Sequence, residues 1–455
     1  MSAVETTVPA RRALLVTLLT IGVGVLSLWV ARSPIQLPLY ISVAAVFFLA
    51  TLLNADVGFV LLILSMLFSP EVGFGGAGGR GLEGSRSVTL RTDDCVLLLV
   101  GVAWIARMAI HKDLGAIRRT SLNGVLALYT AACLLSTLLG IEAGRVRPLV
   151  GLLFVSKYLE YVIIFFITVN YVRTESRYRR LLAAVLITAA LIVVYATWQI
   201  PSGIRPSAPF EGTEGEPNTL GGYLVLIFSV ATGVALTVPD RTWRRAAGFL
   251  AAGTLPALIA TLSRSSWMAL VGALLVLLLL SPGRRRLAAL AIVAMSVLLF
   301  VHPQKVEDRL AYTIQGEDHG SLTVGRVRLD PSSSARLSSW SGALAAFQRH
   351  PIAGWGITGY GFLDAQYFRV LVELGLLGIA AFALLLTGLT RLFLRTYRTL
   401  TEPLHRGLGL GLAAGLAGLM VHAIGTNTFL LIRIMEPFWL LTGLSVAAID
   451  LETEA

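Results

Sequence analysis

Arginines that could hold an anion stand at the borders of long apolar runs. Arg264 lies between two such runs, in the segment A-T-L-S-R-S-S-W-M-A-L. A charge at such a place is costly unless it is paired or reaches water. Two interpretations are open, an arginine that reaches back to the membrane surface and an anion clamp at the mouth of a cavity.

A second arginine opens a polar stretch near residue 350. Arg336 precedes a predicted amphipathic helix over roughly 338–348, which carries Trp340 and stops at His350-Pro351. A guanidinium group can bind a phosphate through two parallel hydrogen bonds. Arg336 is therefore a candidate phosphate ligand, and the competing interpretation is a solvated charge in a long loop.

Polar side chains also gather where apolar helices are predicted to begin. Asp364 stands in the first turn of one such helix, close to Gln366 and Tyr367, and Asn218 stands similarly in P-N-T-L-G-G-Y. A carboxylate near an apolar wall can serve as a general base, and an amide can bind a polar substrate. Ordinary helix capping explains Asp364 and Asn218 equally well.

Two ionisable pairs fall inside apolar runs. Lys157 and Glu160 are three residues apart, and Arg369 and Glu373 are four apart, so each pair can meet on one helix face. Such a pair marks either a water-lined cavity or a structural tie. Lys157 is kept as a candidate substrate contact.

Metal and disulfide chemistry are not expected. The external histidines, among them His319 after Glu317-Asp318, show no ligand spacing, and Cys95 and Cys133 both sit in apolar runs. We expect no metal and no cofactor. His319 remains an alternative base to Asp364.

The composition identifies the class of protein. The chain has 455 residues, of which 56% are hydrophobic and 14% charged, and its mean hydropathy is +0.77. Soluble domains carry about a quarter charged residues, so a polytopic membrane protein in contact with lipid is predicted. The net charge of +11 follows from basic loops on one side of the membrane. Nucleic-acid binding is not expected.

The apolar runs predict an all-α protein with about 14 transmembrane helices, within a range of 12–14. The predicted spans are 13–30, 36–53, 57–69, 94–110, 122–139, 150–172, 181–200, 221–238, 247–262, 266–281, 287–301, 366–388, 407–424 and 435–450. Arginine-rich loops alternate along this order, which puts both termini in the cytoplasm. The candidate site then faces outward, and a large external loop separates the eleventh and twelfth spans.

The predicted spans divide the chain into four parts. These are N-terminal spans over 1–140, central spans over 141–301, a large periplasmic loop with short helices over 302–365, and C-terminal spans over 366–455.

Three ordered motifs resemble a known family. The run R-x-x-x-W-x-x-A-x-x-x-F-x-x-H-P-I-A-G-W-G-x-x-G-Y, followed by D-A-Q-Y-F-R-V-L-V-E-L-G-L-L-G, is similar to the signature region of the O-antigen ligase and polymerase superfamily. P-N-T-L-G-G-Y-L at 217–224 and S-R-S-S-W at 263–267 resemble it too. The resemblance covers roughly 145–390.

The resemblance implies a glycosyltransferase of the bacterial inner membrane with its site on the periplasmic face. It would transfer a glycan from an undecaprenyl-diphosphate carrier to a glycan or lipid-linked acceptor, inverting the anomeric centre without a metal. By the same resemblance, Arg264 and Arg336 would hold the carrier diphosphate. A chain-length regulator protein is a further candidate partner.

Three functions remain open. The ligase branch usually has a histidine where this chain has Asp364-Ala365, and Asp-x-Gln-Tyr variants resemble polymerases of surface polysaccharide or exopolysaccharide. A polymerase is therefore the first hypothesis. A ligase that moves the finished glycan to lipid A-core or another acceptor is the second, and a transporter of lipid-linked glycans is the third.

Overall fold

The computed structural model describes residues 36–69, 92–111, 118–211, 215–281, 323–324, 327–328, 331–361 and 363–454. The predicted spans 13–30 and 287–301 lie outside these ranges, and so does His319.

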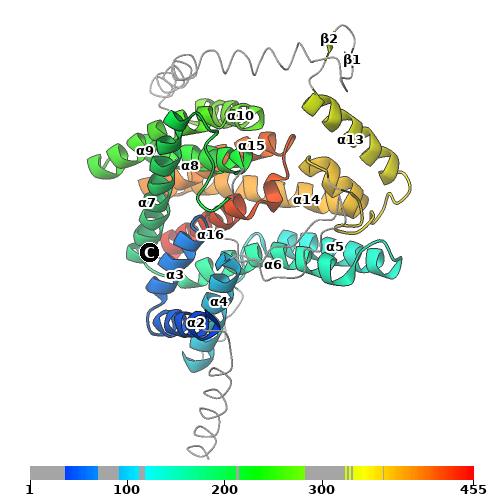
Figure 1. The fold of residues 1–455 in the computed structure, drawn as a ribbon. Coiled ribbons are helices and arrows are strands. Elements are labelled where there is room, and N and C mark those ends of the chain that lie inside the picture. Colours follow the sequence, from blue (N-terminus) through cyan, green and yellow to red (C-terminus); the bar gives the residue numbers. More distant parts are fainter. Residues whose placement is uncertain are drawn as a thin grey trace, which may run out of the picture.

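Helices make up most of the described part of the chain (Figure 1). They are α2 (Gln36–Leu53), α3 (Ala55–Ser65), α4 (Thr92–His111), α5 (Asn123–Glu142), α6 (Pro148–Tyr171), α7 (Glu175–Gln199), α8 (Pro217–Thr237), α9 (Arg241–Ala260), α10 (Arg264–Leu280), α13 (Pro331–Phe347), α14 (Gln366–Thr399), α15 (Pro403–His422) and α16 (Ile432–Glu454). Two 3-10 turns, η1 (Ile200–Ser202) and η2 (Thr428–Leu430), follow α7 and precede α16. Strands β1 (Thr323–Val324) and β2 (Val327–Arg328) pair antiparallel, with Thr323 opposite Arg328.

The helices confirm a polytopic membrane protein. Each of the other twelve predicted spans falls on a helix of the described ranges. Within these ranges, seven helices are long and apolar enough to cross a membrane: α5, α6, α7 with η1, α8, α14, α15 and α16. The total of about fourteen spans stays a prediction.

The central helices pack closely because glycines let their backbones approach. Figure 1 shows α8, α15 and α16 in the middle of the described helices, and α8 packs against α15. A Cβ atom on Gly233 of α8 would lie 2.3 Å from the carbonyl oxygen of Gly407 and 2.8 Å from the Cα atom of Gly411, both in α15. Contacts between small residues of this kind hold helices together in lipid, where the hydrophobic effect contributes little to helix association.

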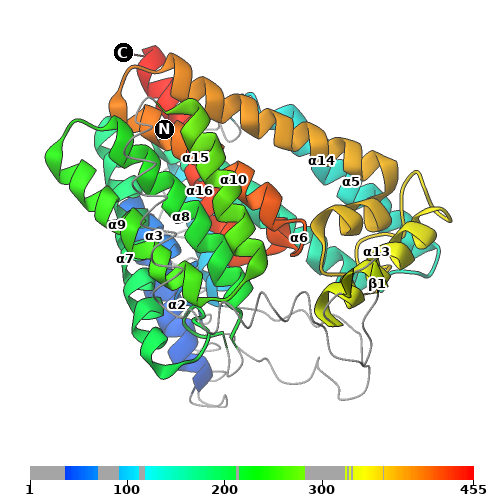
Figure 2. The ribbon, with the colours of Figure 1, turned by 90° about the horizontal axis from the view of Figure 1, so that it is seen from above.

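A break in α14 places the residues of the candidate site. Gly375 has φ +67° and ψ −160°, so the helix stops and restarts within its length. Figure 2 shows α13 beside the first part of α14, and these two helices are in contact. The segment after α13 then folds back onto the break.

The glycine-rich segment 350–361 satisfies the backbone groups that the break exposes. Its amides donate to α14 carbonyls before the break, and its carbonyls accept from α14 amides after it. The four bonds are Trp355 N to Val372 O (3.0 Å), Gly356 N to Glu373 O (2.9 Å), Leu376 N to Pro351 O (2.8 Å) and Leu377 N to Ile352 O (3.1 Å). Within a membrane such groups cannot be left unpaired, so the glycine motif has a structural function here.

The helix predicted over 338–348 is longer in the structure. It begins at Pro331, whose fixed φ suits the first turn of a helix, and it ends at Phe347 before Pro351. Ser334 is buried in the added turns.

The break predicts a glycine requirement. A Cβ atom on Gly375 would lie 2.4 Å from the Ile352 carbonyl oxygen, and the positive φ adds strain. We expect Gly375→Ala to cost about 1–3 kcal/mol of stability, measured as a lower melting temperature in detergent. Gly248→Ala in α9 is the control, since nothing lies within 4 Å of its Cβ position. Equal melting temperatures for the two variants would contradict the prediction.

Candidate functional site

Three arginines from distant parts of the chain line one open pocket. They are Arg205, Arg264 and Arg336, and the rest of the lining is Asn218 with Leu262, Ser263 and Ser265. The pocket thus brings together two of the predicted arginines and the predicted asparagine. It also contains Arg205, which the sequence analysis missed.

Two helices begin at this pocket. Arg264 is the first residue of α10, after Ser263, whose side chain accepts a hydrogen bond from Ser266 N (3.4 Å). Asn218 is the second residue of α8, after Pro217. Helix N-termini present unpaired N–H groups and a partial positive charge, so both favour an anion. Helix ends and guanidinium groups therefore act in the same direction.

Arg205 enters the pocket from the segment between η1 and α8. Its Nε atom donates to the carbonyl oxygen of Thr261 (2.7 Å), at the end of α9. This bond fixes the guanidinium group beside the turn that carries Arg264. The signal that could have found it is the predicted topology, which puts Arg205 on the outer side, where arginines are comparatively rare.

Asp364 lies next to the pocket, just before α14. Its Oδ2 atom is 4.0 Å from Nη2 of Arg336, and about a third of its side chain is exposed. Burial raises the pKa of the Asp364 carboxyl above its ordinary value of 3.8, while the positive charge of Arg336 and the Asn427 N–H act in the opposite direction. The carboxyl is thus held close to an arginine without a hydrogen bond to it.

The other predicted residues of this region make internal contacts. Gln366 is fully buried, and its Oε1 atom accepts from Phe429 N (3.2 Å). The Tyr367 hydroxyl donates to Met420 O (2.7 Å), and the Trp340 ring stacks on Phe368 at 4.9 Å. These contacts hold the start of α14, directly after Asp364, against η2, α15 and α13.

Lys157 lies away from the lining of the arginine pocket. It is buried in α6, where it is paired with Asp94 of α4 and with Glu160 (3.3 Å to Oε2). The predicted contact between Lys157 and Glu160 is present. Asp94, the additional partner from α4, was not foreseen.

Arg369 and Glu373 form a buried structural pair. Their side chains are each 3% exposed, and Arg369 Nε is 3.0 Å from Glu373 Oε2. The other carboxylate oxygen of Glu373 accepts a hydrogen bond from Thr358 N (3.2 Å). The pair therefore joins α14 to the glycine-rich segment.

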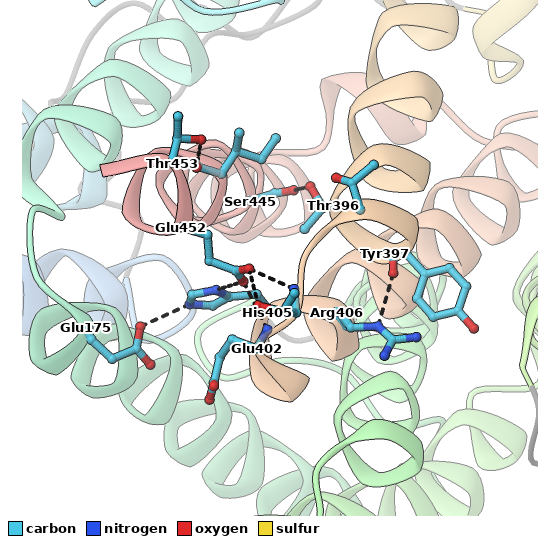
Figure 3. A network of polar contacts seen from close by, with 12 residues as sticks. Glu175, Thr396, Tyr397, Glu402, His405, Arg406, Ser445, Glu452 and Thr453 are labelled. Carbon is cyan, nitrogen blue, oxygen red and sulfur yellow. Dashed lines mark hydrogen bonds and ion pairs between the residues drawn. The ribbon is translucent and has the colours of Figure 1, made fainter. Parts of the chain in front are cut away.

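A second polar network lies at the other end of the helices (Figure 3). His405 is buried between Glu452, which is 2.8 Å from Nδ1, and Glu175, which is 3.1 Å from Nε2. Arg179 joins Glu175 to Glu402, each at 2.7 Å. These residues stand at the ends of α7, α15 and α16 that are distant from the arginine pocket, and they tie the three helices together.

The fold and the pocket define a membrane protein with a cationic site at one end of its helix bundle. Residues 249–383 match the family model described as O-antigen ligase. The match contains Arg264, Arg336 and Asp364, and it confirms the resemblance drawn from the motifs. Over residues 249–383 the chain is therefore similar to the O-antigen ligase family, whose members are membrane enzymes that transfer lipid-linked glycans. The comparison with curated proteins found no match.

The buried pair of Arg369 and Glu373 predicts a loss of stability when its charge balance is removed. Glu373→Gln leaves the Arg369 charge buried without its counter-charge and is expected to cost about 3–5 kcal/mol of stability. The melting temperature in detergent measures this. Arg179→Ala, at an exposed ion pair, serves as the control and should cost about 0.5 kcal/mol. If Glu373→Gln melted like the wild type, the structural interpretation of the pair would be wrong.

Proposed function

We propose that this protein polymerises glycan units carried on undecaprenyl diphosphate, on the periplasmic face of the bacterial inner membrane. The observation that carries the proposal is the pocket in which Arg205, Arg264 and Arg336 meet the N-termini of α8 and α10. The family match over 249–383 supports glycan transfer as the type of reaction.

The pocket suits a diphosphate leaving group. When the glycosidic bond to the diphosphate breaks, the bonding electrons go to the phosphate oxygen, and negative charge grows there. Arginines that are already in place stabilise this charge, because each is permanently ionised and can donate two parallel hydrogen bonds. In this proposal the arginines offset the charge of the leaving group, and Asn218 is a further polar contact.

Asp364 is the proposed base. Its carboxylate takes the proton of the acceptor hydroxyl while that oxygen bonds to the anomeric carbon and the diphosphate leaves from the opposite face. Direct displacement of this kind inverts the anomeric centre. Burial raises the pKa of Asp364, which makes it a better base than an exposed aspartate.

In this proposal, the other residues predicted as substrate contacts have structural roles. Gln366, Tyr367 and Trp340 hold the start of α14, directly after Asp364, and Lys157 belongs to a separate buried cluster. His319, the alternative base, lies outside the described residues. The acceptor is a glycan or a lipid-linked glycan, and a chain-length regulator is a proposed partner.

The orientation of the protein is part of the proposal. Basic side chains crowd the end of the bundle distant from the pocket; they are Arg173, Arg177, Arg179, Arg180, Arg241, Arg244, Arg245, Arg391, Arg395, Arg398 and Arg406. The positive-inside rule assigns that end to the cytoplasm. The arginine pocket then faces the periplasm.

A ligase is the second candidate, and the description of the matching family favours it. The aspartate at position 364, in place of the usual histidine, favours the polymerase. The two differ in product: a polymerase produces a ladder of lengths on its carrier, and a ligase moves an existing ladder to a new acceptor. A transporter would change the sidedness of carrier-linked sugar without a new glycosidic bond.

The assigned roles predict the behaviour of conservative variants. Arg336→Lys keeps the charge but loses the two-point contact, and Asp364→Asn keeps the shape but loses the basicity. We expect Arg336→Lys to lower the transfer rate about 10–100-fold and Asp364→Asn to lower it about 100-fold or more. Glycan extension is measured in membranes that contain carrier-linked oligosaccharide. Arg349→Lys, at an exposed position beyond α13, is the control, and wild-type rates in both test variants would refute the roles.

The raised pKa of Asp364 predicts a pH dependence. A base must be deprotonated to act, so activity should fall as the pH drops through the raised pKa of this carboxyl. The midpoint of the acid limb is expected above 3.8, the ordinary value for aspartate. A rate profile over pH 3.5–8 measures it, and a midpoint at or below 3.8 would contradict the prediction.

A further inference from the structure

One short segment reaches both the arginine pocket and the residues on either side of Asp364. It consists of His422, the last residue of α15, and the connection between α15 and α16, residues 423–431, which includes η2. It lies outside the residues that the family model matches, and it contains none of the motifs from the sequence analysis. Its contacts at its two ends reach the two halves of the proposed site.

At the first end, His422 supports the turn that carries Arg264. Its Nε2 atom is 3.2 Å from Ser266 Oγ, and Ser266 Oγ donates to Ser263 Oγ (2.8 Å), which belongs to the pocket lining. On its other side, the His422 Nδ1 atom lies 2.8 Å from the Thr428 hydroxyl oxygen.

In the middle, Gly425 packs beside the arginine pocket. A Cβ atom at this position would lie 3.7 Å from Arg336 Nη1 and 3.7 Å from Ser265 Cβ. The connection therefore passes along the wall of the pocket, and a side chain larger than a methyl group would press on Arg336.

At the other end, Asn427 holds the segment that carries Asp364. Its Nδ2 atom donates to Leu363 O (2.8 Å), and its backbone N–H lowers the pKa of the Asp364 carboxyl by favouring the charged form. Two more bonds follow the same path, Gln366 N to Ala423 O (3.1 Å) and Phe429 N to Gln366 Oε1 (3.2 Å). Asn427 is only 7% exposed, so these contacts are shielded from water.

We propose that the α15–α16 connection sets the distance between the arginine pocket and Asp364, and that Asn427 is the positioning residue for that carboxylate. The proposal rests on the proposed function, in which Asp364 is the base. Asn427 touches no reacting atom; it acts through Asp364.

The physical reason is the nearness of Arg336. Its Nη2 atom is 4.0 Å from Asp364 Oδ2, so a small movement would join the two in a tight ion pair. In such a pair, Asp364 could no longer accept the proton of the acceptor hydroxyl, and Arg336 could no longer bind the diphosphate. The bond from Asn427 to Leu363 O holds the segment that carries Asp364 and so keeps the groups apart, and misplacement by about 1 Å can cost about 100-fold in rate.

The charges around Asp364 define what a change at Asn427 should do. Arg336 of α13 and Arg369 of α14 face the carboxyl as positive charges, and Glu216 before α8 faces it as a negative one. The backbone N–H of Asn427 lowers the pKa of this carboxyl, and the side-chain bond to Leu363 O holds that backbone in place. Loosening this contact should therefore move the acid limb of the rate profile to higher pH, and a new carboxylate at position 427 should move it further.

The test uses the full-length protein in detergent or membranes and two probes. Geranyl diphosphate reports the arginine pocket in a direct binding measurement, and carrier-linked oligosaccharide reports transfer. We expect Asn427→Ala to bind geranyl diphosphate within about twofold of the wild type, since the pocket is untouched. Its transfer rate should fall at least about 10-fold, with the acid limb moved to higher pH. Asn427→Asp should move the limb further.

Asn170→Ala is the matched control. It also removes a hydrogen bond of a side-chain amide, from Asn170 Nδ2 to Phe166 O (2.8 Å), at the end of α6 distant from the pocket. It should leave the transfer rate and the acid limb of the rate profile unchanged. A wild-type rate and limb in Asn427→Ala would overturn the proposal, and so would parallel loss of geranyl diphosphate binding and transfer. Asp364→Asn, measured beside them, separates the two proposals: if it stays active, the assignment of the base is wrong whatever Asn427 does.

Discussion

The structure depends on a constraint that the membrane imposes on broken helices. Hydrocarbon offers no hydrogen bonds, so the interruption of α14 at Gly375 must be satisfied by protein groups. The glycine-rich segment does this with amides on one side of the break and carbonyls on the other. Because Asp364 lies between that segment and α14, the same bonds that permit the break also fix where this carboxyl can lie. The buried Arg369–Glu373 pair adds a second tie at the same place.

Electrostatics at the pocket follows from this scaffold. Three guanidinium groups in one small pocket repel one another, and two helix N-termini add positive potential. A diphosphate would relieve that repulsion, and the relief would increase as the leaving group gains charge. The scaffold therefore holds charge in advance where the proposed reaction develops it, which is the most effective form of electrostatic catalysis. Asp364 provides the opposite charge at the edge of the pocket.

The two ends of the bundle are held by different polar contacts. At the end distant from the pocket, His405 with Glu175 and Glu452 joins three helices. At the pocket end, the α15–α16 connection joins the turn of Arg264 to the segment of Asp364. In each case a histidine at a terminus of α15 is buried and bonded to neighbouring helices. Helix α15, packed against α8 through glycines, thus links the two ends.

The sequence by itself determined the class, the helical segments and two of the three pocket arginines. Hydropathy predicts the helices, because each membrane-spanning helix must expose about 20 apolar residues to lipid. The borders of these runs then reveal Arg264, since a charge there is expensive, whereas Arg336 is found at the start of the polar stretch near residue 350. Tertiary structure decided what spacing cannot encode: that Arg205, some 60 residues before Arg264 in the chain, shares its pocket, and that Lys157 does not line it. It also revealed the break at Gly375. From the sequence, a glycine within an apolar run is predicted to be helical; only the structure shows the Ile352 carbonyl oxygen at the place where a side chain would lie. Contacts between segments distant in sequence, such as Asn427 with Leu363, depend on how helices pack, and no local pattern specifies that packing.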